Sequence, residues 1–165
     1  MTFIKAGLVV VSMMSLAACE NGNIFGGGNG GSGATPEGTI EENSLEYFAT
    51  TIGDRVLFAV NEATLSDASK VVLDAQVAWL NQYPERTIII EGHADEQGTR
   101  EYNLALSARR AAAVQNYMVS KGLLASRLSV IPYGKERPLE ICSTEACWSK
   151  NRRAVTVVAG GLGSV

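Results

Sequence analysis

A glycine-rich run near the N-terminus divides this chain into two parts. The run Gly26-Gly27-Gly28-Asn29-Gly30-Gly31-Ser32-Gly33 lies at the centre of a segment, Asn21–Gly38, that has too little apolar surface to fold. A phosphate-binding glycine loop is the alternative, but no strand precedes the run and no Gly-Lys-Ser/Thr follows it. The sequence therefore predicts a flexible tether over residues 19–39, which would span roughly 25 Å.

The remaining composition is that of one globular domain. The chain has 165 residues, of which 46% are hydrophobic and 19% charged, and its formal net charge is -3. The pairs Arg109-Arg110 and Arg152-Arg153 are too short to form a basic surface that would collect nucleic acid. We therefore expect a folded domain over residues 40–160, a short tail over 161–165, and no nucleic-acid partner.

The first nineteen residues have the pattern of a secretory signal. Lys5 is their only charge, an apolar stretch follows it, and small residues precede Cys19. The sequence Leu16-Ala17-Ala18-Cys19 resembles the bacterial lipobox, which implies removal of residues 1–18 and attachment of lipid to Cys19. Several acyl chains on one residue anchor a protein stably to a membrane. In bacterial lipoproteins an aspartate directly after this cysteine favours retention in the inner membrane. Glu20 occupies that position here, which implies sorting to the outer membrane.

Two further cysteines, Cys142 and Cys147, form an even pair in an oxidising compartment. Neither a second cysteine pair nor a nearby histidine supports a zinc site at this spacing. A local disulfide is favoured over two free thiols.

Two long helices and four strands are expected after the tether. The first helix is predicted to begin after Ser66, a typical N-cap residue, and to end at Tyr83-Pro84. Its apolar residues are spaced to form one stripe along the helix: Ala68, Val72, Ala75 and Trp79. The second helix is predicted over residues 101–121, with Gly122 after its C-terminus. A short helix is predicted over residues 44–52, and the strands over 55–60, 87–90, 128–131 and 154–158.

This order predicts an α+β fold, a β-α-β-α-β-β sandwich. In such a fold the two long helices pack on one face of a mixed four-stranded sheet.

The segment after the second strand carries the candidate chemistry. Asp95 lies in a loop between Gly92 and Gly98, and Arg110 lies on the helix that Thr99 is expected to cap. The residues Asn103, Leu106, Ser107 and Arg110 are spaced to share one helix face. An aspartate and an arginine on opposite sides of a cleft would suit a ligand with both an ammonium and a carboxylate group.

Spacing alone leaves other interpretations open. Asp95 and Arg110 could simply form a surface ion pair, which contributes about 0–1 kcal/mol. A metal site with Glu96 is poorly supported because His93 is the only histidine. A serine nucleophile is no better supported, since the chain has no Gly-x-Ser-x-Gly motif.

The same segment resembles the signature of OmpA-like peptidoglycan-binding domains. The matching motifs are Gly92-His93-Ala94-Asp95 and Asn103-Leu104-Ala105-Leu106-Ser107-Ala108-Arg109-Arg110-Ala111, with Tyr133-Gly134-Lys135-Glu136-Arg137-Pro138 and Lys150-Asn151-Arg152-Arg153-Ala154-Val155. The resemblance covers about residues 54–158. It implies the OmpA-like β-α-β-α-β-β sandwich.

The resemblance also implies roles for individual residues. Asp95 and Arg110 would hold the ammonium and carboxylate of meso-diaminopimelate in the peptidoglycan stem peptide. Asn61, where many relatives have aspartate, and Ala94, where they have threonine, would line the site without supplying the usual charge or hydroxyl. Gln97 replaces a common arginine. The remaining expected pocket residues are Asn103, Leu106 and Arg153.

Together these features predict a non-enzymatic outer-membrane lipoprotein that faces the periplasm and holds the cell wall. The resemblance implies TolB and the Tol complex as partners, a role in cell division, and no cofactor. The alternatives are a wall-binding lipoprotein of another envelope assembly and a metal-dependent peptidoglycan hydrolase.

Overall fold

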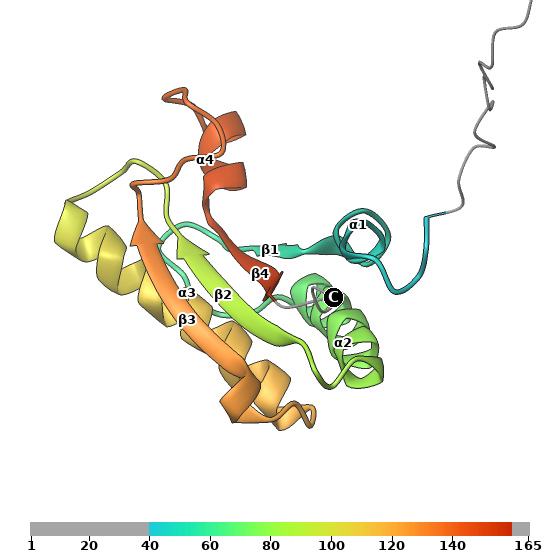
Figure 1. Ribbon diagram of the computed structural model, residues 1–165. Helices are drawn as coiled ribbons and strands as arrows, with labels where there is room; N and C mark the ends of the chain where they lie inside the picture. Colours follow the sequence, from blue (N-terminus) through green and yellow to red (C-terminus); the bar gives the residue numbers. More distant parts are fainter. Residues whose placement is uncertain (1–39, 160–165) are drawn as a thin grey trace, which may run out of the picture. The chain divides into compact units, whose positions relative to one another are not determined.

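The computed structural model describes residues 40–159, which fold around one mixed sheet (Figure 1). The sheet order is β1-β4-β2-β3; β2 and β3 are parallel, and β4 runs antiparallel to both of its neighbours. The elements in chain order are α1 (Leu45–Tyr47), η1 (Phe48–Gly53), β1 (Arg55–Leu57), α2 (Asp67–Gln82), β2 (Thr87–His93), α3 (Arg100–Ser120), η2 (Ala125–Arg127), β3 (Leu128–Gly134), α4 (Glu145–Asn151) and β4 (Arg153–Ala159).

The predicted fold class is confirmed. The long helices α2 and α3 pack on the same face of the sheet, where they share one core with its strands, and Figure 1 shows α3 running behind β3. Their buried side chains form one core with those of the strands, and the core includes Leu73, Leu80, Ile88, Ile90 and Met118. No helix within residues 40–159 is long and apolar enough to cross a membrane. The predicted signal, the lipidated Cys19, the tether and the tail 161–165 lie outside the described residues.

The predicted ends of the long helices agree with the structure. Ser66 caps α2 by accepting a hydrogen bond from the backbone N–H of Ser69, and Thr99 caps α3 by accepting one from Tyr102. Gly122 follows α3 with a φ of 102°, a conformation that favours glycine. The leading helix is also present, as a turn of α1 that continues into the π-helix η1.

The predicted apolar stripe of α2 is wrong at Ala68 and Ala75, which are exposed. Polar residues occupy part of the buried face, and each has a partner. The Gln76 amide donates to the Gly53 carbonyl at 2.6 Å and accepts from the Thr156 hydroxyl at 2.8 Å. Because hydrogen bonding offsets the cost of burying such groups, the buried face need not be apolar. It comprises Ser69, Leu73, Gln76, Val77, Trp79 and Leu80.

Two further expectations need correction. β1 ends at Leu57 rather than at residue 60, because the chain turns away after Phe58 donates to the Arg152 carbonyl. The seven-residue helix α4 separates β3 from β4, so the last two strands are not directly consecutive. The other three strands are longer than predicted: β2 by three residues, β3 by three and β4 by two.

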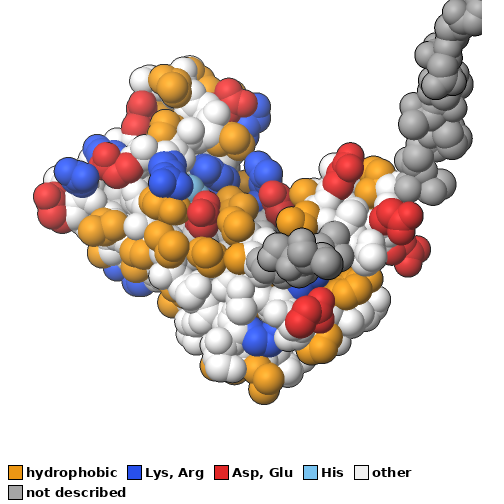
Figure 2. All heavy atoms as spheres, viewed as in Figure 1, with side chains coloured by type: hydrophobic (Ala, Val, Ile, Leu, Met, Phe, Trp, Pro, Cys, Tyr) orange, Lys and Arg blue, Asp and Glu red, His pale blue; other side chains and the backbone are white. Residues whose placement is uncertain are grey.

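The sheet has a second face that α2 and α3 do not cover. Alternation places Ile89, Ile131 and Val155 on this face, and each is only partly buried. Figure 2 shows the face from the front, with hydrophobic side chains across its centre and Lys and Arg side chains gathered above them. The long helices therefore cover one face of the sheet, as the predicted sandwich requires.

Candidate functional site

The site lies where β2 ends and the chain enters the loop that leads to α3. Gly92 allows β2 to lie directly against α3, because a Cβ at this position would be 2.0 Å from the Ser107 carbonyl oxygen. The chain then leaves the strand at Ala94, which is buried and donates its backbone N–H to the Gly134 carbonyl at 2.8 Å. Asp95 follows in a fixed position beside the N-terminal half of α3.

Asp95 is buried, and its carboxylate has two partners. Its Oδ1 accepts the backbone N–H of Gln97 at 3.2 Å, and its Oδ2 lies 3.3 Å from Nη1 of Arg152. Asn103 holds the same loop from α3 by donating its side-chain amide to the Gln97 carbonyl at 2.8 Å. A carboxylate has about four positions for accepting hydrogen bonds, so Asp95 keeps capacity for another donor.

Arg110 lies beneath this loop on α3 and is completely buried. Its Nε, Nη1 and Nη2 donate to the backbone carbonyls of Glu62, His93 and Ala59 at 2.8, 2.9 and 3.0 Å. Burial lowers the pKa of Arg110 to about 10, and the nearby Asp95 carboxylate acts in the opposite direction. The surface ion pair that spacing left open is therefore wrong: both groups are buried, and the ion-pair partner of Asp95 is Arg152.

A groove of about 510 Å³ is lined by Asn61, Gln97, Gly98, Thr99 and Tyr102, and the backbone N–H of Gln97 in this lining donates to Asp95. Asn61 has a φ of 56°, a conformation that asparagine tolerates better than most residues. It belongs to the turn whose Ala59 and Glu62 carbonyls accept from Arg110. The groove and the buried guanidinium are therefore connected through one short turn.

The predicted residues on α3 share one buried face, as their spacing indicated. Asn103, Leu106, Ser107 and Arg110 are all buried. The Ser107 hydroxyl accepts from the backbone N–H of Gly134 at 2.9 Å and so ties α3 to the end of β3. Leu106 lies outside the main hydrophobic core.

Arg152, which sequence reasoning did not select, contacts the site, whereas its neighbour Arg153 does not. Arg152 pairs with Asp95 and also with Glu145 of α4. Hydrogen bonding to Arg152 holds the pKa of the Glu145 carboxyl below its usual range. The alternation of side chains along β4 could have identified Arg152. Arg152 is separated by even numbers of residues from the buried residues Ala154 and Thr156, so its side chain lies on the same face of the sheet as theirs.

Arg153 lies on the opposite face of the sheet. Its guanidinium donates to the carbonyls of Asn151 and Arg137, at 3.4 and 3.3 Å. His93 lies on the same face as Arg153. Its burial lowers its pKa to about 4, and the positive charges of Arg153 and Arg137 contribute to the shift. His93 is therefore neutral at physiological pH and stacks on Tyr133 at 5.4 Å.

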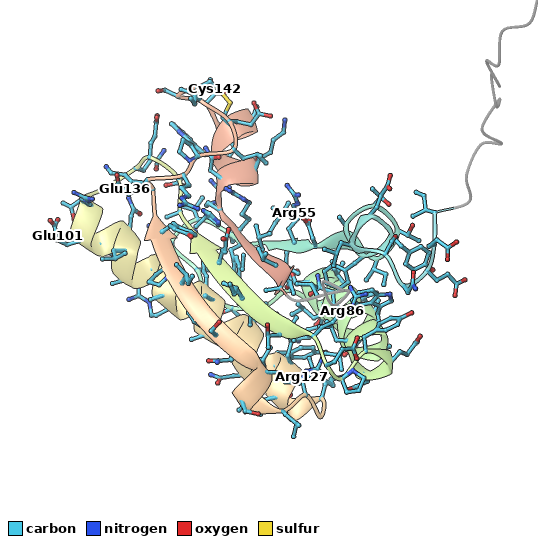
Figure 3. All side chains as sticks on the ribbon, viewed as in Figure 1. Arg55, Arg86, Glu101, Arg127, Glu136 and Cys142 are labelled. Carbon is cyan, nitrogen blue, oxygen red and sulfur yellow. A yellow bond between two sulfur atoms is a disulfide. The ribbon has the colours of Figure 1, made fainter. Side chains whose placement is uncertain are left out.

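α4 and the loop before it lie beside the loop that contains Asp95. Cys142 and Cys147 are joined by a disulfide, with their Cα atoms 5.8 Å apart. Figure 3 shows Cys142 at the tip of the molecule, beyond α4. Trp148 of α4 donates its indole N–H to Oε1 of Glu96 at 3.1 Å. Residues 40–159 contain no group of three or more His, Cys, Asp or Glu side chains that could hold a metal ion.

Comparisons with known proteins agree with this architecture. The sequence model of the OmpA family matches residues 57–152. The peptidoglycan-associated lipoprotein of Mesorhizobium japonicum is 46% identical over 93% of this chain and 90% of its own length, and that of Rhizobium meliloti is 44% identical over 95% and 88%.

Solved structures show the same fold. The crystal structure of the peptidoglycan-associated lipoprotein from Burkholderia pseudomallei is 33% identical, with a TM-score of 0.65 over 67% of this chain and 96% of that one. The C-terminal domain of Helicobacter pylori MotB, 18% identical with a TM-score of 0.61 over 66% and 85%, shares the fold alone. This chain therefore belongs to the OmpA family and, within it, to the peptidoglycan-associated lipoproteins.

Proposed function

We propose that this domain binds peptidoglycan noncovalently and does not cleave it. The observation that carries the proposal is the placement of a buried carboxylate, Asp95, and a buried guanidinium, Arg110, beside one open groove. A ligand with an ammonium and a carboxylate on one carbon would find an opposite charge for each group. meso-Diaminopimelate of the stem peptide has this arrangement.

Each end of the ligand meets a different situation in the protein. The Asp95 carboxylate has unused acceptor positions and could accept hydrogen bonds from the ammonium group. Arg110 has five N–H groups and uses three of them on backbone carbonyls. Because two of those carbonyls belong to Ala59 and Glu62, a bidentate carboxylate would require the turn around Asn61 to shift.

The other proposed pocket residues shape this site in different ways. Asn61 lines the groove and Asn103 fixes the Gln97 backbone. Ala94 and Leu106 are buried, so their side chains are not open to the groove. We propose Arg152 as a member of the site in addition to the predicted pocket residues, because it contacts Asp95, whereas Arg153 does not.

Asp95→Asn should weaken peptidoglycan binding by roughly ten- to a hundredfold, because the change removes the negative charge while keeping the size of the side chain. Co-sedimentation of the chain with purified diaminopimelate-type peptidoglycan measures the effect. Arg109→Ala is the matched control, since Arg109 is the exposed neighbour of Arg110. If Asp95→Asn and Arg109→Ala sediment as fully as the unchanged protein, the ligand binds elsewhere.

We also propose that lipid on Cys19 anchors the chain in the outer membrane, so that the domain works in the periplasm on a tether. The names of the relatives support a lipoprotein, and the sequence Leu16-Ala17-Ala18-Cys19 supports the position of the lipid.

Cys19→Ser should move the protein from the membrane fraction to the soluble periplasmic fraction, because the acyl chains would be lost. Cell fractionation measures the change. Mass spectrometry of the unchanged protein should show a lipid-modified N-terminus at Cys19, and an uncleaved, unmodified N-terminus would contradict the anchor.

The proposed partner in the envelope is TolB, and through it the Tol complex, with a role in drawing the outer membrane inward during division. Retention of TolB by the immobilised chain would separate this function from that of a lipoprotein in another envelope assembly. A metal-dependent hydrolase is less well supported, because the only histidine of the chain is buried on the far face of the sheet from the groove.

A further inference from the structure

One guanidinium in the site lies between two carboxylates. Arg152 Nη1 is 3.3 Å from Oδ2 of Asp95 and 3.2 Å from Oε2 of Glu145, and Arg152 Nη2 contacts Oε1 of Glu145. Its Nε is already used, because it donates to the Phe58 carbonyl at 3.2 Å. Arg152 therefore makes two contacts with Glu145 and a single, longer one with Asp95.

Arg152 is shared unequally between the two carboxylates. It bonds to both of them, whereas the guanidinium of Arg110, which also lies near Asp95, spends its hydrogen bonds on backbone carbonyls. Glu145 has the better geometry, since a carboxylate that meets both terminal nitrogens of an arginine forms the stronger pair. Asp95 has one longer contact with Arg152 and keeps acceptor positions for another donor, and its side chain is only 10% exposed. That carboxylate is what an ammonium group would meet.

We propose that Glu145 is a positioning residue for ligand binding: by holding Arg152, it keeps Asp95 available to the ammonium group of the ligand. The inference rests on the proposed function, because it assumes that Asp95 accepts the ammonium of meso-diaminopimelate. Without Glu145, both terminal nitrogens of Arg152 turn to Asp95 and compete with the ligand for that carboxylate.

α4 is anchored so that Glu145 stays in place. Glu145 is the first residue of this helix, and two residues later Cys147 is bonded to Cys142 in the preceding loop. At the other end of α4, the Asn151 side chain accepts from the backbone N–H groups of Leu139 and Glu140, at 2.7 and 3.1 Å, and donates to the Glu140 carbonyl at 2.8 Å.

Trp148 completes the anchoring from the centre of α4. Its bond to Glu96 joins the helix to the residue that follows Asp95 in sequence. α4 is thus tied both to the loop before it and to the loop that contains Asp95, and these contacts hold Glu145 near Asp95. The disulfide thus has a role at the site although it lies outside the groove. Figure 1 shows α4 at the end of the sheet where β2 and β3 terminate.

The test uses the full lipidated chain in detergent, with calorimetric binding of a muramyl tripeptide that contains meso-diaminopimelate. Glu145→Gln removes the charge but keeps the size, and should weaken binding about fivefold or more. Glu145→Asp keeps the charge and should restore most of the affinity. A purely structural role would not distinguish the two variants by charge.

A double-mutant cycle combines substitutions of Glu145 and Arg152. In an Arg152→Gln background, Glu145→Gln should change the affinity little, because the residue through which it acts is gone. The inference is overturned if Glu145→Gln binds as tightly as the unchanged chain, or if Glu145→Asp is as weak as Glu145→Gln. An equal fold-loss with and without Arg152 would overturn it as well.

The behaviour of the unchanged chain separates this inference from the proposed function. Binding of the tripeptide by the unchanged chain, with no effect of Glu145→Gln, leaves peptidoglycan binding intact and removes the role of Glu145. Failure of the unchanged chain to bind the tripeptide overturns the proposed function, and the role of Glu145 with it. The same tripeptide with L-lysine in place of diaminopimelate is the ligand control, because it lacks the second carboxylate.

Discussion

Gly92→Ala should destabilise the domain by about 3 kcal/mol or more, although alanine is the smallest possible addition. The new Cβ would lie 2.0 Å from the carbonyl oxygen of Ser107 and 2.7 Å from its carbonyl carbon. Both atoms belong to the α3 backbone, so no side-chain rotation relieves the overlap, and β2 and α3 must separate. The midpoint of thermal unfolding should fall by roughly 10 °C or more.

Gly122→Ala is the matched control for this change. A Cβ at Gly122 would meet nothing within 4 Å, but its φ is 102°, so alanine there bears backbone strain without a clash. We expect that variant to lose only about 1 kcal/mol. A Gly92→Ala midpoint equal to that of Gly122→Ala would show that the two elements can move apart at little cost.

The contact at Gly92 also explains why the site lies where it does. Close packing of β2 on α3 brings the His93 carbonyl within 2.9 Å of the Arg110 guanidinium, and the end of β3 within reach of the Ser107 hydroxyl. The glycine of the Gly92-His93-Ala94-Asp95 motif is therefore needed for helix-to-strand packing, whereas the aspartate bonds to Gln97 and Arg152.

Local features of this fold were predictable from the sequence. The N-caps Ser66 and Thr99 accept hydrogen bonds from backbone N–H groups three residues later, and Gly122 adopts a positive φ where α3 ends. The shared face of Asn103, Leu106, Ser107 and Arg110 follows from helical spacing alone. Each of these inferences needs only a few neighbouring residues, so a linear pattern contains the necessary information.

Partners that are distant in sequence could not be predicted in this way. Arg110 donates to carbonyls that lie 17, 48 and 51 residues away, and Gln76 is buried because its partners are Gly53 and Thr156. Nothing in the spacing of charged residues shows that backbone carbonyls will surround an arginine. The apolar stripe of α2 failed for the same reason, since burial of Gln76 depends on remote hydrogen bonds.

The choice between Arg152 and Arg153 is an intermediate case. Side chains alternate across a strand, so one of two adjacent arginines at the start of β4 had to face the core and the other the opposite side. Ala154 and Thr156 are the core residues, which assigns the core side to Arg152. α4 gave a weaker signal, because its seven residues are too few for an apolar period to be recognised.

Arg110→Ala should destabilise the domain by about 3 kcal/mol and should also abolish peptidoglycan binding. The change leaves the carbonyls of Ala59, Glu62 and His93 without their donor, and it opens a cavity beneath the groove. It also removes the contact of the guanidinium with the Phe58 ring, whose centroid lies 5.2 Å away. Urea denaturation measures the loss as a lower midpoint with an unchanged slope.

Arg109→Ala and Arg110→Lys together show which property of Arg110 matters. Arg109 is exposed one position earlier on α3, so its loss should change stability by less than about 0.5 kcal/mol. Lysine at position 110 keeps the charge but has a single nitrogen, which cannot reach three carbonyls in different directions, so it should recover less than half of the lost stability. Full recovery with lysine would show that charge alone stabilises the site, and equal stability of Arg110→Ala and Arg109→Ala would show that the three carbonyls do not need their donor.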